Sequence, residues 1–212
     1  MKSKCIANCE PNVVASFNPI PVSPVVAEDS YVHPLARLIG SVTLGHWVMV
    51  APFACLRADE GQGLRIGNET NIQDGVILHG LKSWEHGGVI PDGVVSVGEN
   101  KYSIYVGDRV SLAHQCQVHG PAFVGNDTFI GMQSLLLRAS VGKNCVVEPR
   151  CTIIGVSISD GHYVPAGSVI NTQEQADRLP MITAEYGMRN FNEEVVEVNI
   201  ELCRGYLERD RG

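Results

Sequence analysis

Apolar residues recur at every sixth position over most of the chain, and this spacing is the dominant pattern in the sequence. A period of six fits neither an amphipathic helix nor the simple alternation of a half-buried strand. It is typical of hexapeptide repeats, which fold into a parallel β-helix. The repeated aliphatic positions are Val32, Leu38, Leu44, Val50, Leu56, Ile66, Ile72, Leu78, Val106, Leu112, Val118, Val124, Ile130, Leu136, Val141, Val147, Ile153, Ile158, Val164 and Val169.

Three hexapeptides would make one triangular coil, with the aliphatic positions pointing inward and successive coils stacked at about 4.8 Å. We expect the glycines that follow several of these positions to supply the permissive backbone that tight corners need. These glycines are Gly40, Gly67, Gly98, Gly107, Gly125, Gly131 and Gly142. Known hexapeptide folds have left-handed crossovers, an exception to the usual rule. This resemblance predicts a mainly β protein, a left-handed parallel β-helix of hexapeptide repeats with a C-terminal α-helix.

The sequence divides into three regions. Residues 1–28 contain several prolines and little periodicity, which predicts an extended N-terminal strap. Residues 29–171 carry the six-residue rhythm and are expected to form the β-helix catalytic domain. A stretch at about 79–105 interrupts the rhythm and is predicted to be a loop insertion. Residues 172–212 have a different pattern and are expected to be helical.

The C-terminal region predicts two helices. Residues 172–179 favour a short helix that Pro180 ends. Residues 188–209 favour a long amphipathic helix, because apolar residues recur there at helical spacing. Those residues are Phe191, Val195, Val198, Leu202 and Tyr206. We expect this helix to pack along a face of the prism or on a neighbouring subunit.

Composition and charge exclude several classes of protein. The 212 residues are 44% hydrophobic and 18% charged, which is typical of a globular chain. The net charge of −7 argues against a nucleic-acid partner or an anionic membrane surface. The sequence has no apolar run of about 18 residues, which is the length that a transmembrane helix needs. The N-terminus lacks an intact signal peptide, so we expect a cytoplasmic protein, with a secreted form already trimmed of its signal as the alternative.

The seven cysteines show no zinc-type pairs, and most lie inside apolar runs, where cysteine behaves as a small hydrophobic residue. This pattern favours a reducing compartment. The alternative concerns Cys5 and Cys9, which would close a small loop if they were oxidised.

One column of the predicted prism carries two histidines. Placing three hexads in each coil aligns the residues after the aliphatic positions into a column of Arg57, His79 and His119. This alignment requires the 79–105 insertion to leave one corner and rejoin in register. The two histidines would then be vertical neighbours about 4.8 Å apart at the backbone. At that distance two imidazoles can share one metal ion.

A third histidine falls on a different side of the prism. His114 lies in the preceding hexad, with Asp74 beneath it. Since one side spans up to about 20 Å, His114 is not expected to reach the His79 and His119 metal within one chain. A neighbouring prism would supply it. The register therefore predicts a homotrimer with three metal sites, each at an interface between subunits.

These three histidines suit a catalytic metal. Three neutral imidazoles with one open position are typical of catalytic Zn²⁺, which lowers the pKa of bound water to about 7. Fe²⁺ or Co²⁺ would also accept this ligand set. Three other histidines, His33, His46 and His162, are more simply interpreted as surface or core residues.

Polar residues cluster on the coils just below the metal column. Arg57 and Asp59 are most simply interpreted as a salt bridge at an interface. Glu60 is a candidate general base or proton carrier. Gln73 is a candidate site residue, with a corner hydrogen bond as the alternative.

Several motifs resemble the gamma-class carbonic anhydrases, particularly the archaeal type with an acidic-loop insertion. The motifs are LRADEG from Leu56, TNIQDGVILH from Thr70, SLAHQCQVHGP from Ser111, FIGMQ from Phe129 and NEEVVEVN from Asn192. The resemblance implies a zinc-dependent lyase that hydrates CO₂ reversibly to bicarbonate and a proton, through a metal hydroxide. It implies that His79, His114 and His119 are the metal ligands.

The resemblance also implies roles for the surrounding polar residues. Glu60 and Gln73 would contact the metal-bound hydroxide or the bicarbonate. Asn199 on the terminal helix would hold substrate or help to carry protons. Arg57 and Asp59 would join subunits, and Asn71 would support Gln73.

One position departs from the family pattern. The archaeal type carries a glutamate proton shuttle three residues after the first ligand, where this chain has Lys82. An ammonium group with a pKa near 10.4 is a poor proton carrier at pH 7. Glu85 or His86 would replace it, and His86 is preferred because imidazole titrates near pH 6.5.

Two other functions remain open from the sequence. Hexapeptide acyltransferases use a single histidine as base and no metal, and the stacked pair of His79 and His119 argues against that class. Non-catalytic relatives of the carbonic anhydrases serve as scaffolds in carboxysomes and respiratory complexes. The three histidines, together with Glu60 and Gln73, argue against a scaffold role.

Overall fold

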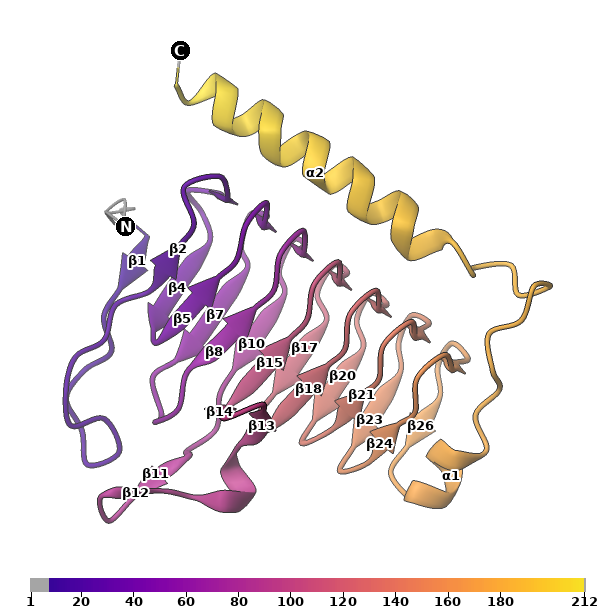
Figure 1. Cartoon of the computed structure of the whole chain (residues 1–212), viewed down its shortest axis with the longest axis horizontal. Coiled ribbons are helices and arrows are strands. Elements are labelled where there is room, and N and C mark those ends of the chain that lie inside the picture. The colour runs from indigo at the N-terminus through magenta and orange to yellow at the C-terminus, as the bar shows by residue number, and fades with distance from the viewer. Residues whose placement is uncertain (1–7, 212) are drawn as a thin grey trace.

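The computed structural model describes residues 8–211, and it is a left-handed parallel β-helix with a long C-terminal helix beside it (Figure 1). The predicted fold class is confirmed. Cys5 lies outside the described residues, so the structure does not test the alternative of a Cys5–Cys9 bond. Within residues 8–211, no helix has both the length and the apolar character needed to span a bilayer.

Three parallel sheets form the sides of the prism, and the chain visits them in turn. Sheet 1 has eight strands, ordered β1 (Cys9–Glu10), β4 (Arg37–Gly40), β7 (Cys55–Ala58), β10 (Ile77–His79), β17 (Gln117–His119), β20 (Leu135–Leu137), β23 (Thr152–Ile154) and β26 (Val169–Ile170). Sheet 2 has β2 (Val25–Val26), β5 (Val42–Leu44), β8 (Leu64–Ile66), β15 (Ile104–Val106), β18 (Ala122–Val124), β21 (Ser140–Val141) and β24 (Ser157–Ile158). Sheet 3 has β3 (Tyr31–Val32), β6 (Met49–Val50), β9 (Asn71–Ile72), β16 (Ser111–Leu112), β19 (Phe129–Ile130), β22 (Val146–Val147) and β25 (Tyr163–Val164).

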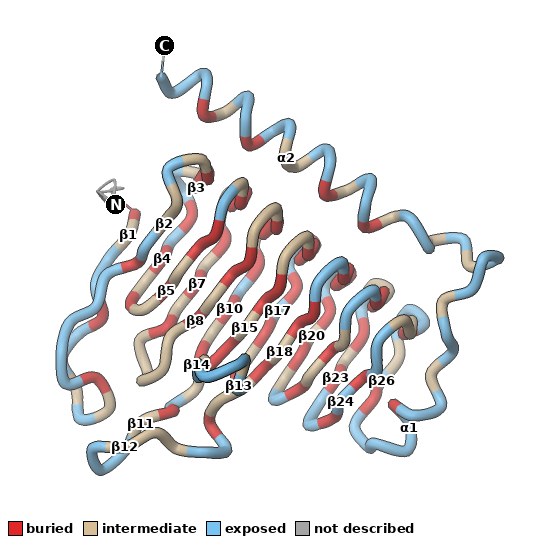
Figure 2. The backbone as a smooth tube through the Cα atoms, viewed as in Figure 1, coloured by how far each residue is buried: buried red, intermediate tan, exposed pale blue. Residues whose placement is uncertain are grey.

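The repeated aliphatic residues fill the inside of the prism, where Figure 2 shows buried positions along every rung. One predicted inward residue is wrong. Val169 is 56% exposed, and Ile170 is buried in its place. The reason is register: β26 pairs with β23 so that Ile170 lies opposite Ile153, which keeps the six-residue interval from Val164. The expected one-residue slip does not occur there.

Most glycines of the repeat are needed because neighbouring coils approach closely there, and only some of them have a positive φ. Among the predicted corner glycines, Gly40 and Gly98 have positive φ, at 80° and 59°. A Cβ on Gly67 would instead lie 2.4 Å from the backbone of Gly107 in the next coil. Several left-handed corner positions are occupied by larger residues, among them Gln115, Gln133 and Arg150. The corners therefore tolerate positive φ without glycine because stacked neighbours fix the chain there.

The insertion between β10 and β15 contains two small antiparallel hairpins. The first pairs β11 (Trp84–Glu85) with β12 (Gly88–Val89), and the second pairs β13 (Val95–Val97) with β14 (Asn100–Tyr102). A short 3₁₀ helix, η1 (Pro91–Gly93), lies between them. The insertion projects from one corner of the prism (Figure 1), and the chain then rejoins sheet 2 at Ile104. The coils on either side of it stay in register.

Two helices follow the last coil. In α1 (Gln173–Asp177), Thr172 and Gln175 form a capping box. The long α2 (Phe191–Arg209) packs against strands β3, β6 and β16 of sheet 3.

The predicted apolar face of α2 is only partly correct. Phe191 does pack edge-to-face against Phe129, and Tyr206 stacks on Tyr31, both of sheet 3. Val198 and Leu202, however, are 55% and 45% exposed, and other residues of the helix are buried instead. These are Asn192, Val196, Cys203 and Leu207. With these aromatic contacts at its two ends, the helix turns Val198 and Leu202 outward.

Candidate functional site

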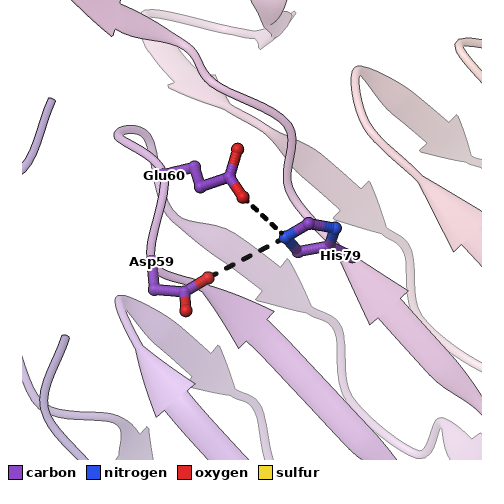
Figure 3. A group of neighbouring side chains, drawn as sticks. All are labelled: Asp59, Glu60 and His79. Carbon is purple, nitrogen blue, oxygen red and sulfur yellow. Dashed lines mark hydrogen bonds and ion pairs between the residues drawn. The ribbon is translucent and has the colours of Figure 1, made fainter.

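Two carboxylates and a histidine meet at the end of β10, as Figure 3 shows. His79 is the last residue of that strand, and the loop after β7 carries Asp59 and Glu60. The Nε2 atom of His79 lies 3.1 Å from Glu60 Oε1 and 3.9 Å from Asp59 Oδ1. The side chains of His79, Asp59 and Glu60 are 16%, 17% and 30% exposed, so the cluster is partly shielded from water.

His119 lies directly beside His79 on the next rung, as the register predicted. The two residues are paired between β10 and β17, and their ring centroids are 5.4 Å apart in an edge-to-face arrangement. Burial, followed by the charge of His79, lowers the pKa of His119, and Glu60 opposes this shift. A lowered pKa keeps the imidazole of His119 neutral to lower pH, and the neutral ring is the form that binds metals.

Arg57 and Asp59 form an ion pair within the chain. Arg57 donates through Nη2 and Nε to Asp59 Oδ2, at 3.0 and 3.2 Å. Within residues 8–211, the other carboxylate oxygen, Asp59 Oδ1, is buried and accepts no hydrogen bond. A buried polar atom without a partner needs an explanation, and a bound cation close to His79 would supply one.

A second polar group lies at the corner between sheets 3 and 1. His114 Nδ1 is 3.0 Å from Asp74 Oδ2, and both side chains are 52% exposed. The expected position of Asp74 beneath His114 is confirmed. On the same corner, Gln73 donates to Asn71 Oδ1 at 3.0 Å, and Asn71 donates to Ser111 Oγ at 2.8 Å.

The single chain does not assemble the three histidines at one point. His79 and His119 project from sheet 1, whereas His114 occupies the corner that follows β16. Above the two histidines, the same column of sheet 1 continues with Leu137 and Ile154 and so becomes apolar. One chain therefore carries two separate polar clusters, and the proposal below treats each as half of a site. We call Asp59, Glu60, His79 and His119 the sheet half-site, and Asn71, Gln73, Asp74 and His114 the corner half-site.

The candidate proton carriers lie in the first hairpin of the insertion. Lys82 and Glu85 form a close ion pair. The hydrogen bond from Lys82, and then its charge, lowers the pKa of Glu85. His86 is exposed at the turn between β11 and β12, with a φ of 52°. All three side chains are exposed, and Lys82 and Glu85 are engaged with each other.

Asn199 lies on α2, away from the sheet half-site of its own chain. Its side-chain amide donates to the carbonyl of Val195 at 2.8 Å, and the residue is half-buried. Since α2 covers sheet 3 and His79 projects from sheet 1, Asn199 does not join the His79 cluster within one chain.

Two residues that the sequence did not single out hold the loop that carries Glu60. Asn18 Oδ1 accepts the Gly61 N–H at 2.9 Å, and Ser83 Oγ accepts the Gln62 N–H at 2.6 Å. Asn18 and Ser83 lie in irregular segments without a repeat. Their burial, at 5% and 0% exposure, is the signal that identifies them, and it is visible only in the fold.

Comparisons with known proteins point to one family. No sequence-family model matches the chain. The chain is 49% identical to the "Carbonic anhydrase" of Methanosarcina thermophila, over 95% of this chain and 82% of that protein. It is 43% identical to the "Carboxysome assembly protein CcmM" of a Nostoc species, over 86% of this chain but only 31% of that protein.

Two further proteins are similar to the chain, one in sequence and one in structure. The chain is 29% identical to "Gamma carbonic anhydrase 2, mitochondrial" of Arabidopsis thaliana, over 69% of this chain and 46% of that protein. Among solved structures, a hexapeptide transferase family protein from Anaplasma phagocytophilum superposes with a TM-score of 0.66. It is 25% identical and covers 87% of this chain and 93% of its own.

Proposed function

This chain belongs to the family of the gamma-class carbonic anhydrases, and we propose that it catalyses the reversible hydration of CO₂ to bicarbonate and a proton. One observation carries the proposal. Two histidines on adjacent rungs face each other, with the Glu60 carboxylate 3.1 Å from the Nε2 atom of His79. The insertion after His79 favours the archaeal type within the family.

The sheet half-site fits a divalent metal ion. His79 and His119 would be two of its ligands, and the unpartnered Asp59 Oδ1 is consistent with a cation nearby. Imidazole nitrogens suit Zn²⁺, and Fe²⁺ or Co²⁺ would also be accepted. When bound, such an ion supplies Lewis acidity, which lowers the pKa of water to about 7.

The third ligand would be His114 of a neighbouring copy, in a homotrimer. The sheet half-site is partly buried, whereas His114 and Asp74 of the corner half-site are each 52% exposed in the single chain. Joining the corner half-site of one copy to the sheet half-site of the next would complete each site. The apolar end of the histidine column, at Leu137 and Ile154, would be covered by the same contact.

The side chains around the metal ligands would bind substrate and move the proton. Hydration joins a water oxygen to the carbon of CO₂ and releases one proton, which Glu60 would accept at Oε1. Gln73, held by Asn71, would orient bicarbonate from the neighbouring corner half-site. Asn199 would hold substrate or assist proton transfer from the helix α2. Arg57 and Asp59 would brace the contact between subunits.

The proton would leave through the insertion hairpin. Glu85 is tied to Lys82 and its pKa is lowered, so it is poorly matched to proton transfer at neutral pH. His86 is exposed on the same hairpin and would pass the proton to buffer.

The four buried cysteines of the described chain fit the reducing compartment that the sequence favours, and we retain a cytoplasmic location as part of the proposal. Their thiols have raised pKa values because they are buried. They are Cys116, Cys145, Cys151 and Cys203.

A scaffold role is the second candidate, favoured by the 43% identity to a carboxysome assembly protein. The decisive experiment is a stopped-flow CO₂-hydration assay on protein purified anaerobically, with its metal content measured on the same sample. We expect about one metal ion per chain and hydration far above the uncatalysed rate. Bound metal without hydration would support the scaffold, and acyl transfer by metal-free protein would support a hexapeptide acyltransferase.

A further inference from the structure

The N-terminal segment reaches the loop that carries Glu60. Asn18 is 5% exposed, and its side chain brackets that loop from both directions. Its Oδ1 accepts the N–H of Gly61 at 2.9 Å, and its Nδ2 donates to the carbonyl oxygen of Asp59. Glu60 is the residue between these two bonds, so the amide of Asn18 spans the backbone on which the Glu60 side chain is mounted.

The Glu60 loop needs such support because its own backbone does not determine its shape. Gly61 has a φ of 115°, a backbone conformation that favours glycine. Because glycine also adopts many other conformations, contacts from outside the loop are needed to hold this one. On the opposite side, the buried Ser83 donates its N–H to the carbonyl of Glu60 at 2.9 Å. Its hydroxyl accepts the N–H of Gln62 at 2.6 Å. The loop is therefore held between the N-terminal segment and the insertion.

Asn18 is itself presented by a closed turn. The backbones of Ala15 and Asn18 bond to each other in both directions, at 2.9 and 3.0 Å. Asn12, which is 5% exposed, accepts the N–H of Val22 at 2.7 Å and donates to the carbonyl of Ile20 at 3.1 Å. These bonds close the turn at its base, so a hydrogen-bonded turn fixes the position of the Asn18 side chain next to the Glu60 loop.

We propose that Asn18 is a positioning residue that keeps the Glu60 carboxylate beside the Nε2 atom of His79. The N-terminal segment would thus support the site by holding the Glu60 loop, although it contributes no group that touches substrate. The catalytic part of this inference rests on the proposed function, and its structural part does not.

Hydrogen exchange tests the structural part without any need for activity. In Asn18→Ala we expect the Gly61 amide to exchange at least roughly fivefold faster, because it loses its acceptor. Asn8→Ala is the matched control: Asn8 is equally buried, but it donates to the carbonyls of His33 and Ala36, away from the loop. Asn18→Ser, which leaves a smaller cavity, serves if the alanine variant does not fold. Unchanged Gly61 exchange in a folded Asn18 variant would overturn the inference, whether or not the protein hydrates CO₂.

A double-mutant cycle with Glu60 tests the catalytic part. We expect Asn18→Ala to lower kcat by roughly tenfold in the native background and to have little further effect in a Glu60→Ala background, since residues acting as a unit are not additive. A residue that only stabilised the fold would reduce activity by the same factor in both backgrounds, and that result would reject the positioning role. Asn8→Ala should leave kcat unchanged in both. If the wild-type chain is inactive, the proposed function fails, and Gly61 exchange still decides whether Asn18 braces the loop.

Discussion

At the scale of single residues, the candidate site is built around two imidazoles that share one column of sheet 1. Their separation is imposed by the stacking of strands and not by any local sequence motif, and it leaves the rings 5.4 Å apart. Glu60 comes to the same column from a loop, which is why its position depends on hydrogen bonds from other segments. The two histidines are thus fixed by the fold, and the carboxylate is fixed by its neighbours.

Removing one histidine of the pair should abolish tight metal binding. In His119→Ala we expect metal affinity to fall by more than the roughly 10–100-fold that is typical when only a hydrogen-bonding partner of a ligand is lost. Equilibrium metal binding, measured by competition with a chelator, provides the readout. His162→Ala is the control, because its ring bonds the backbone carbonyls of Ser159 and Asp160. Native metal affinity in His119→Ala would contradict the assignment.

The exposed imidazole of His86 should matter most when buffer is scarce. In His86→Ala we expect turnover to fall several-fold in weak buffer and to recover when imidazole is added, because proton transfer to solvent would become limiting. The measurement is kcat for CO₂ hydration across a series of buffer concentrations. Unchanged activity in weak buffer, with no rescue by imidazole, would rule out His86 as the proton carrier.

At the scale of elements, the prism is held together by close contact between coils, and glycine permits that contact on several rungs. The helix α2 packs on sheet 3 through an aromatic contact at each end, edge-to-face at Phe191 and stacked at Tyr206. Val198 and Leu202 remain on the outer side of the helix, where a neighbouring copy can cover them. The coil contacts therefore set the core, and the helix leaves a partly apolar outer face.

The glycine contacts predict opposite effects at two positions. Gly67→Ala should destabilise the protein by about 2 kcal/mol or more, because the added Cβ would lie 2.4 Å from backbone atoms of Gly107. Gly205→Ala, in the exposed part of α2 with open space around it, should stabilise by about 0.5–1 kcal/mol. Chemical denaturation of both variants gives the two values. A Gly67→Ala protein as stable as the native one would show that the coils can move apart.

At the scale of the whole molecule, one chain holds the two half-sites apart, and under the proposed function a second copy would complete each of them. Because the two half-sites lie apart on the prism, the copies would assemble head to tail. Each copy would offer its sheet half-site to one neighbour and its corner half-site to the other. In a closed ring of three copies, every sheet half-site would meet a corner half-site, as the register predicts.

Mixing two inactive variants provides a test of this arrangement. We expect His114→Ala and the double variant His79→Ala with His119→Ala each to be inactive alone. Mixed, dissociated and reassembled, they should recover about a quarter of native activity, because about a quarter of the interfaces in random trimers join two intact half-sites. Sedimentation of the native protein should show a trimer. No recovery in mixed trimers of confirmed composition would mean that the histidines do not meet across the interface.

The sequence predicted much of the prism but little of what surrounds it. The six-residue period identified the inward residues, except at the last rung, where Val169 was chosen over Ile170. It also aligned His79 with His119 across a long insertion. It did not identify the buried face of α2, since two helical stripes carry apolar residues and only contact with sheet 3 selects one of them.

The sequence alone determined the repeat, the register and the column of histidines, because stacked coils impose a fixed spacing that any regular pattern of apolar residues reveals. Only the tertiary structure decided which segments brace the Glu60 loop, because Asn18 and Ser83 lie in stretches without a period. Hydrogen bonds between such stretches depend on where each irregular segment comes to rest in space. That placement is settled by packing over the whole molecule, which local spacing along the chain does not encode.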